Sequence, residues 1–105
     1  MADNGSRLGF KPPHPGEIIR EDILPELGLT VSQLAAHLKV SRNSASRLIN
    51  ERSAVSLEMA VRLGQAFQNG TRFWLALQMQ HDLWNADRDG TIKIAAIARP
   101  VPSVA

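Results

Sequence analysis

The sequence contains no cysteine, no tyrosine and no long hydrophobic run. Without thiols the chain forms no disulfide and holds no thiolate-bound metal, a composition that suits the reducing cytoplasm, where we expect the protein. No stretch approaches the roughly 18 apolar residues that cross a membrane, and the first residues, M-A-D-N-G-S-R, lack the apolar core of a signal peptide. We therefore expect no membrane partner.

The residue patterns of common enzyme classes are absent as well. The chain has no glycine-rich phosphate loop and no serine nucleophile elbow. Its three histidines, His14, His37 and His81, are far apart, and none lies at a known metal-ligand spacing. We expect no enzymatic activity, no catalytic residue, no metal site and no cofactor.

The charges of the chain are unevenly distributed, although its net charge is only +2. Residues 39–52 contain four cations (Lys39, Arg42, Arg47 and Arg52) against one acid, and residues 17–26 contain four acids (Glu17, Glu21, Asp22 and Glu26) against one cation. One surface should attract phosphate, and another should attract a basic partner. The alternative, that both runs are solvated helix faces, stays open.

A twenty-residue stretch, residues 31–50, is typical of a helix-turn-helix. Leu34, Ala35 and Leu38 repeat at helical spacing, and after Ser41 the residues Ala45, Leu48 and Ile49 do the same. The small alanines allow the two helices to cross closely. In such a motif the second helix lies in the major groove of DNA, with its first residues on base edges.

Caps and breakers predict five helices on a chain whose 105 residues support one domain. The first helix begins near Pro15, and Pro25 and Gly28 end it. Thr30 opens the second helix with a capping box, and Ser41 and Ser56 cap the third and fourth. The fifth begins at Thr71, and Lys39 occupies the turn, where a positive φ is common.

The last helix predicts a homodimer. Its segment F-W-L-A-L-Q-M-Q-H-D-L-W contains three of the five aromatic residues, and its apolar stripe is wider than one small core covers. We assign the dimer contacts to Phe73, Trp74, Leu77 and Trp84. A twofold dimer would read a palindromic operator with half-sites about one helical turn, roughly 34 Å, apart.

The predicted DNA-binding surface is the side of the third helix opposite its apolar residues. Arginine grips guanine through two hydrogen bonds, asparagine pairs with adenine, and serine serves either role. The amide of Gln33 and the guanidinium of Arg52 suit backbone phosphate. The full predicted set is Gln33, Ser41, Arg42, Asn43, Ser44, Ser46, Arg47, Asn50 and Arg52. An ordinary polar helix surface is the alternative.

Three motifs together resemble a known family: H-P-G-E-I (residues 14–18), the helix-turn-helix of the Cro/C1 (XRE) type, and the segment at residues 73–84. They resemble the HigA-type antitoxins, and the resemblance covers residues 13–85. The family usually has asparagine where Ala76 stands. The resemblance implies an all-α, five-helix, lambda-repressor-like domain at residues 13–86, followed by a short C-terminal extension.

The resemblance further implies a dimeric repressor of its own operon that neutralises a HigB-type toxin, a small basic ribonuclease of the RelE type that cleaves messenger RNA. In this family the two subunits of the dimer commonly contact each other through their C-terminal helices. The acidic residues Glu17, Glu21 and Asp22 could face this toxin. A stand-alone helix-turn-helix repressor without a toxin is the alternative, and an interaction module that has lost DNA binding is a distant third.

Two segments lie outside the domain. Residues 1–12, polar and with two glycines, are predicted to be a flexible N-terminal arm. Residues 87–105 form the tail, in which the alternation of Ile92 and Ile94 permits a short strand before Pro100 and Pro102. The tail is either a loose end or an arm that contacts a partner.

Overall fold

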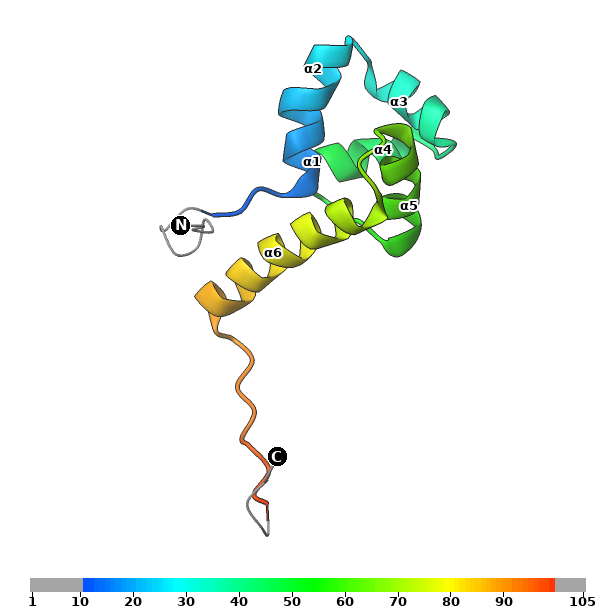
Figure 1. The fold of residues 1–105 in the computed structure, drawn as a ribbon. Coiled ribbons are helices and arrows are strands. Elements are labelled where there is room, and N and C mark those ends of the chain that lie inside the picture. The colour runs from blue at the N-terminus through cyan, green and yellow to red at the C-terminus, as the bar shows by residue number, and fades with distance from the viewer. Residues whose placement is uncertain (1–10, 100–105) are drawn as a thin grey trace, which may run out of the picture.

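Five helices follow one another in residues 11–99, the part of the chain that this computed structural model describes, and no strand occurs among these residues (Figure 1). The first helix is a continuous run of three segments, α1 (Pro15–Ile18), η1 (Ile19–Ile23) and α2 (Leu24–Leu27). The others are α3 (Val31–Leu38), α4 (Arg42–Ile49), α5 (Leu57–Ala66) and α6 (Thr71–Asp89). The predicted all-α, five-helix class is therefore confirmed. Among these residues, no helix combines the length and apolar character that crossing a bilayer requires.

The first helical run contains Pro25, and our prediction that this proline helps to end the helix is wrong. The run continues to Leu27, and Gly28, with a φ of 66°, ends it. The five residues of η1 form a wider π-helical turn, in which the Leu24 N–H donates to the Ile19 carbonyl. In a regular helix the proline ring would collide with the carbonyl four residues earlier. The wider turn directly before Pro25 relieves this collision.

The turn between α3 and α4 has the conformation that the sequence predicts. The Thr30 hydroxyl accepts from the Gln33 N–H and the Gln33 side chain accepts from the Thr30 N–H, which completes the capping box at the start of α3. Lys39 has a left-handed φ of 61°, and the Val40 N–H donates to the Ala35 carbonyl (3.0 Å). Because the turn is this sharp, Ser41 acts as the N-cap of α4 only three residues after Leu38, the last residue of α3.

The core lies where the short helices meet the first half of α6. Trp74, which is completely buried, packs against Phe67 and donates its indole N–H to Asn69 (2.7 Å). Gln78, one turn further along α6, accepts from the Val55 N–H (2.8 Å) and so fixes the loop between α4 and α5. The other buried core residues are Ile19, Leu24, Leu34, Ala35, Leu38, Ala45, Leu48, Ile49, Val55, Ala60 and Leu63.

The last helix is longer than the sequence predicts. α6 continues past residue 86 to Asp89, and Gly90 ends it with a φ of 56°. Residues 91–99 leave the body as an exposed segment without helix or strand, so the permitted strand at Ile92 and Ile94 does not form in this part of the chain (Figure 1). The predicted N-terminal arm lies outside the described residues except for Lys11 and Pro12, and so does the end of the tail.

Candidate DNA-binding site

α4 presents its polar side to solvent because its apolar side is anchored in the core. Ala45, Leu48 and Ile49 are at most 5% exposed, and they hold the helix from behind. Their spacing leaves the opposite face free of core contacts. On this face Arg42, Asn43, Ser44, Arg47 and Asn50 are exposed and Ser46 is half-buried.

The N-terminus of α4 is capped as predicted. The Ser41 hydroxyl accepts from the Ser44 N–H (3.0 Å) and donates to the Ser44 hydroxyl (3.0 Å). Because the cap satisfies a backbone donor that would otherwise lack a partner, it stabilises the first turn by about 1 kcal/mol. Arg42 and Asn43 thus project from an ordered turn.

Arg42 connects the start of α4 with the start of α3. Its Nε donates to the Ser32 hydroxyl (3.0 Å), so the guanidinium lies over the first turn of α3. Gln33, the other predicted contact on α3, is exposed beside Ser32. The structure therefore brings Gln33 and Arg42 to one continuous surface.

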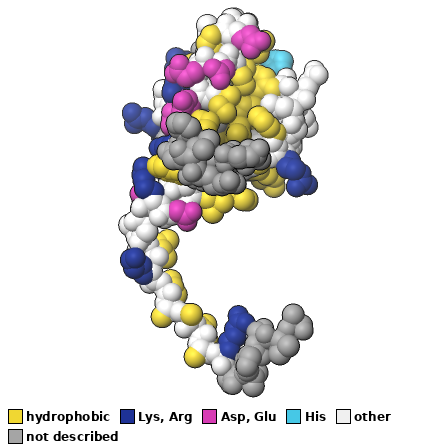
Figure 2. Space-filling model, turned by 60° about the vertical axis from the view of Figure 1, so that its left-hand side comes forward, with side chains coloured by type: hydrophobic (Ala, Val, Ile, Leu, Met, Phe, Trp, Pro, Cys, Tyr) yellow, Lys and Arg dark blue, Asp and Glu magenta, His cyan; other side chains and the backbone are white. Residues whose placement is uncertain are grey.

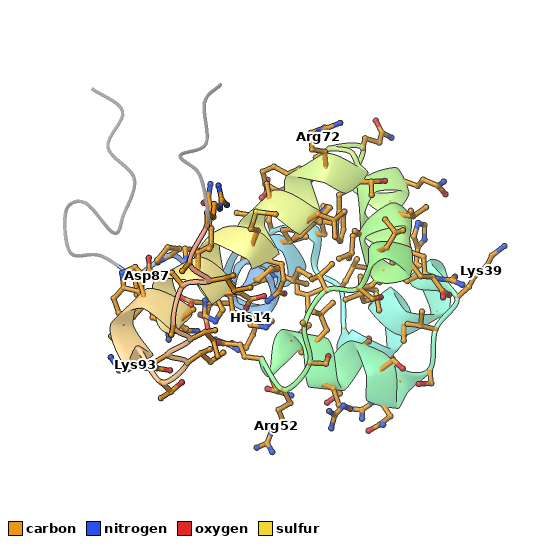
Figure 3. The ribbon with its side chains drawn as sticks, turned by 90° about the horizontal axis from the view of Figure 1, so that it is seen from below. His14, Lys39, Arg52, Arg72, Asp87 and Lys93 are labelled. Carbon is orange, nitrogen blue, oxygen red and sulfur yellow. The ribbon has the colours of Figure 1, made fainter. Side chains whose placement is uncertain are left out.

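The C-terminal end of α4 brings Arg47 and Arg52 together. The Arg52 N–H donates to the Arg47 carbonyl (2.8 Å), and Nη2 of Arg47 donates to the Arg52 carbonyl (3.1 Å). Figure 3 shows Arg52 pointing away from the body just past α4, and Lys39 at the turn before α4. Two cations therefore bracket the helix.

Asn50 and Ser46 are less available than the sequence analysis assumes. The Asn50 side-chain amide donates to the Ser46 carbonyl (2.9 Å) and to its hydroxyl (3.3 Å). Both side chains lie on the expected face, but they are bonded to each other across one helical turn. A base contact that uses the Asn50 amide as a donor competes with these bonds, whereas the Asn50 amide oxygen and the Ser46 O–H keep their bonding capacity.

Behind the exposed face of α4, the start of α1 contacts α4 directly. A Cβ atom at Gly16 would lie 1.9 Å from the Leu48 carbonyl oxygen, so only glycine allows this approach. His14 caps α1, because its Nδ1 accepts from the Gly16 N–H (2.9 Å). Sequence reasoning missed both roles, although the H-P-G-E motif contains the cap and the glycine.

His14 is buried together with a second histidine. Its ring meets the ring of His81 edge to face, with 5.1 Å between the centroids. The Nδ1 of His81 donates to the Pro12 carbonyl (3.0 Å), which is able only to accept. Burial, and to a lesser extent the charge of His81, lower the pKa of His14 below its ordinary value. The cap at α1 therefore depends on a neutral histidine.

Two buttressing arginines are further residues that the sequence analysis missed. Arg20 donates to the Ile49 carbonyl at the end of α4, and Arg62 donates to the Leu38 carbonyl (2.8 Å) at the end of α3. Neighbouring carboxylates, Glu21 first and then Glu51, raise the pKa of Arg20. These partners are 24 and 29 residues apart in sequence, so no helical periodicity reveals them.

The predicted dimer residues do not share one exposed stripe. Trp74 is wrong as a surface contact, since it is completely buried within its own chain, and Leu77 is half-buried against the core. Trp84 is half-buried beneath Arg88, and Phe73 is 43% exposed. The exposed side of α6 differs from the predicted one because aromatic and aliphatic residues occur around most of the helix, so its sequence does not single out one apolar face.

A different apolar stripe lies open on α6. Met79 is 62% and Leu83 is 55% exposed, and they continue a line that begins at Leu75 and Ala76. Two shallow, mainly apolar hollows follow this line, and both contain Leu75 and Met79.

The acidic residues Glu17, Glu21 and Asp22 are all exposed on the first helical run. Figure 2 shows acidic side chains gathered on the upper part of the molecule, where this run lies. The Glu21 carboxylate accepts from Nε of Arg20 (2.9 Å). In the described part of the chain, no three histidine, aspartate or glutamate side chains gather as metal ligands.

Comparison with known proteins assigns the fold to a family. A helix-turn-helix family model matches residues 19–74, which is more than half of the chain. An uncharacterized HTH-type transcriptional regulator of Haemophilus influenzae is 44% identical over 79 residues, covering 75% of this chain and 74% of the relative. Antitoxin HigA-1 of Vibrio cholerae is 35% identical over 75 residues, covering 71% of this chain and 70% of its own.

Solved structures agree with this assignment. The Pseudomonas aeruginosa antitoxin HigA, solved with the higBA promoter, superposes with a TM-score of 0.69 at 34% identity over 78% of this chain and 96% of that one. The antitoxin GraA superposes with a TM-score of 0.75 at 34% identity over 83% of this chain and 100% of that one. The chain therefore belongs to the Cro/C1-type helix-turn-helix family of DNA-binding regulators, to which HigA antitoxins also belong.

Proposed function

We propose that this protein represses its own operon by binding a palindromic operator and that it neutralises a HigB-type ribonuclease toxin. The observation that carries the DNA-binding half is the exposed row of Arg42, Asn43 and Arg47 on a helix whose opposite face is fixed in the core. An anchored helix loses little freedom when it binds, so its side chains meet the bases in a defined register.

α4 has the dimensions of a groove-reading element. Its eight residues extend about 12 Å at 1.5 Å per residue, close to the width of the major groove. Arg42 and Asn43 in the first turn are placed for base edges, as expected when a recognition helix enters with its N-terminal end. Arg47 lies one turn further along the helix.

Phosphate contacts supply the non-specific part of the binding. Lys39 and Arg52 lie at the two ends of α4 (Figure 3), and Gln33 is exposed at the start of α3. Each neutralised phosphate releases counterions, so operator binding should weaken steeply as salt is added.

A homodimer completes the DNA-binding unit. One eight-residue helix reads too few bases for selective binding, and a twofold pair doubles the number read. The apolar stripe from Leu75 through Met79 to Leu83 suits a symmetric contact between two copies of α6, because unpartnered apolar stripes of this kind mark association surfaces.

The toxin half of the proposal is supported by the similarity to HigA antitoxins and by the acidic surface of the first helical run. Glu17, Glu21 and Asp22 are exposed together, and a small basic ribonuclease is a complementary partner.

Operator binding is tested by footprinting the DNA upstream of the gene. We expect two protected half-sites about 34 Å apart, related by a twofold axis. Arg47→Ala should weaken binding by about 1–3 kcal/mol and relax the choice of one base pair if Arg47 reads a base. Arg72→Ala is the control, because Arg72 is an exposed arginine on the opposite side of the molecule (Figure 3). A single, asymmetric half-site would contradict the proposal.

Toxin neutralisation is tested separately by co-expression. We expect a neighbouring gene for a small basic protein to arrest growth when expressed alone, and co-expression of this protein to restore growth. If no adjacent gene product is toxic while the footprint is symmetric, the protein is a stand-alone repressor.

A further inference from the structure

Arg20 connects the first helical run to the C-terminal end of the recognition helix. Its Nη1 donates to the Ile49 carbonyl (2.5 Å), and its Nη2 donates to the Glu51 carboxylate (3.2 Å). Its Nε donates to Glu21 on its own helix (2.9 Å). A cation is favourable at a helix C-terminus, where carbonyl groups lack partners within the helix.

The turn that Arg20 holds is conformationally unusual. Glu51 has a left-handed φ of 60°, which a residue with a side chain adopts only when its surroundings fix it. The Glu51 N–H donates to the Leu48 carbonyl (3.0 Å), and the next residue, Arg52, bonds back to Arg47. The conformation of Glu51 therefore sets the path of the chain after α4, and with it the position of Arg52.

We infer that Arg20 is a positioning residue for DNA binding: it fixes the turn at Glu51 so that Arg52 faces a phosphate group. Arg20 itself is one-third exposed and bonded to protein acceptors, so it reaches the DNA only through these neighbours. The inference rests on the proposed phosphate contact of Arg52 and adds the residue that orients it.

A general folding role would give a different result from a positioning role. α4 is also held by the buried side chains of Ala45, Leu48 and Ile49 and by the close approach of Gly16. These contacts remain when Arg20 is removed, so the helix should stay in place while the turn after it loosens. DNA binding should then suffer more than folding.

A double-mutant cycle tests the inference. Arg20→Ala, Arg52→Ala and the double variant are titrated with fluorescently labelled operator DNA at several salt concentrations. We expect Arg52→Ala to lower the slope of log K against log salt by about 0.9 per protomer, the contribution of one phosphate. Arg20→Ala should lower the slope by nearly as much, and the double variant by no more than Arg52→Ala. Arg20→Lys keeps the positive charge but loses the planar guanidinium that donates to several acceptors at once, so it should restore part of the slope.

Arg62 provides the matched control. It also donates to a helix C-terminal carbonyl and to a carboxylate, Glu58 (2.8 Å), and its side chain is 32% exposed against 34% for Arg20. Because Arg62 holds the end of α3, Arg62→Ala should act additively with Arg52→Ala.

Three results would overturn the inference. Additive losses for Arg20→Ala and Arg52→Ala would show independent roles, and an unchanged salt slope for Arg20→Ala would reduce Arg20 to a folding contact. An unchanged slope for Arg52→Ala would show instead that the proposed phosphate contact is wrong. If Arg20→Ala fails to fold, Glu51→Gln replaces it in the cycle and should lower the slope in the same non-additive way.

Discussion

Replacing Gly16 by alanine should disturb both folding and DNA binding, because the new methyl group has no space. The Cβ atom would lie 1.9 Å from the Leu48 carbonyl oxygen and 2.9 Å from its carbonyl carbon. Both are backbone atoms, so no side-chain rotation relieves the overlap. The start of α1 must move away from α4 by more than 1 Å, the difference between this separation and an ordinary carbon–oxygen contact of about 3.3–3.6 Å.

The expected cost follows from this displacement. Overpacking a closely packed site costs typically 1–3 kcal/mol, and an overlap between two backbones belongs at the upper end of that range. Alanine recovers about 0.5–1 kcal/mol of the backbone entropy that glycine loses in a helix, which does not offset the overlap. We expect a net loss of about 2–2.5 kcal/mol, equivalent to a fall of roughly 8–20 °C in Tm for a domain of this size.

Gly28→Ala is the matched control. An alanine Cβ at Gly28 would meet nothing within 4 Å, and its φ of 66° costs alanine roughly 1–2 kcal/mol of strain alone. Urea unfolding gives the free energy of each variant, and operator titration gives its affinity. Gly16→Ala should lose affinity because α4 shifts, whereas Gly28→Ala should not. Equal stability losses together with an unchanged affinity for Gly16→Ala would refute the reasoning.

Three further predictions concern the histidine cap, the apolar stripe and the acidic surface. Because the folded-state pKa of His14 lies below its ordinary value of about 6.5, its neutral form stabilises the fold above that pH, and this contribution should be lost as the pH falls below 6.5. Tm measured from pH 8 to pH 5 checks this, and His14→Asn, which keeps a cap acceptor, should reduce the slope; the same slope for both proteins would contradict it. Leu83→Asp places a charge on the exposed stripe of α6 and should shift sedimentation from dimer to monomer, while Gln80→Asp on the same helix is the control; a dimer that persists in Leu83→Asp argues against this interface. Reversing Glu17 and Glu21 to lysine should weaken toxin binding measured by calorimetry, and an unchanged toxin affinity would remove these residues from the interface.

Capping residues are the part of this fold that the sequence predicts most directly. Ser41 and Thr30 bond to backbone groups within three residues, so their roles are visible in a short window. The left-handed Lys39 is equally local, because the turn length between Leu38 and Ser41 requires a sharp reversal. The outward face of α4 follows from its apolar spacing alone.

Contacts between distant segments lie beyond such reasoning. Nothing near Arg20 indicates that it bonds to Ile49, because the orientation of two helices determines that pair. Likewise Trp74 is buried and Met79 is exposed on one helix, since the neighbours of α6, rather than its own periodicity, select the face that is covered. Pro25 remained inside its helix because a wider turn formed before it, an adjustment that local propensity does not contain.

The bond between Val55 and Gln78 bears on how the operator must be spaced. It ties the loop that follows the recognition helix to α6, and leaving its buried groups unpaired would cost about 1–3 kcal/mol, so the loop resists stretching. In a dimer joined through α6, the two recognition helices are then held at a fixed separation, which sets the spacing of the half-sites that the dimer can bind. One extra base pair between the half-sites rotates one of them by about 34° relative to the other. The second recognition helix would then be out of register with its half-site, and such an operator should bind more weakly even with both half-sites intact.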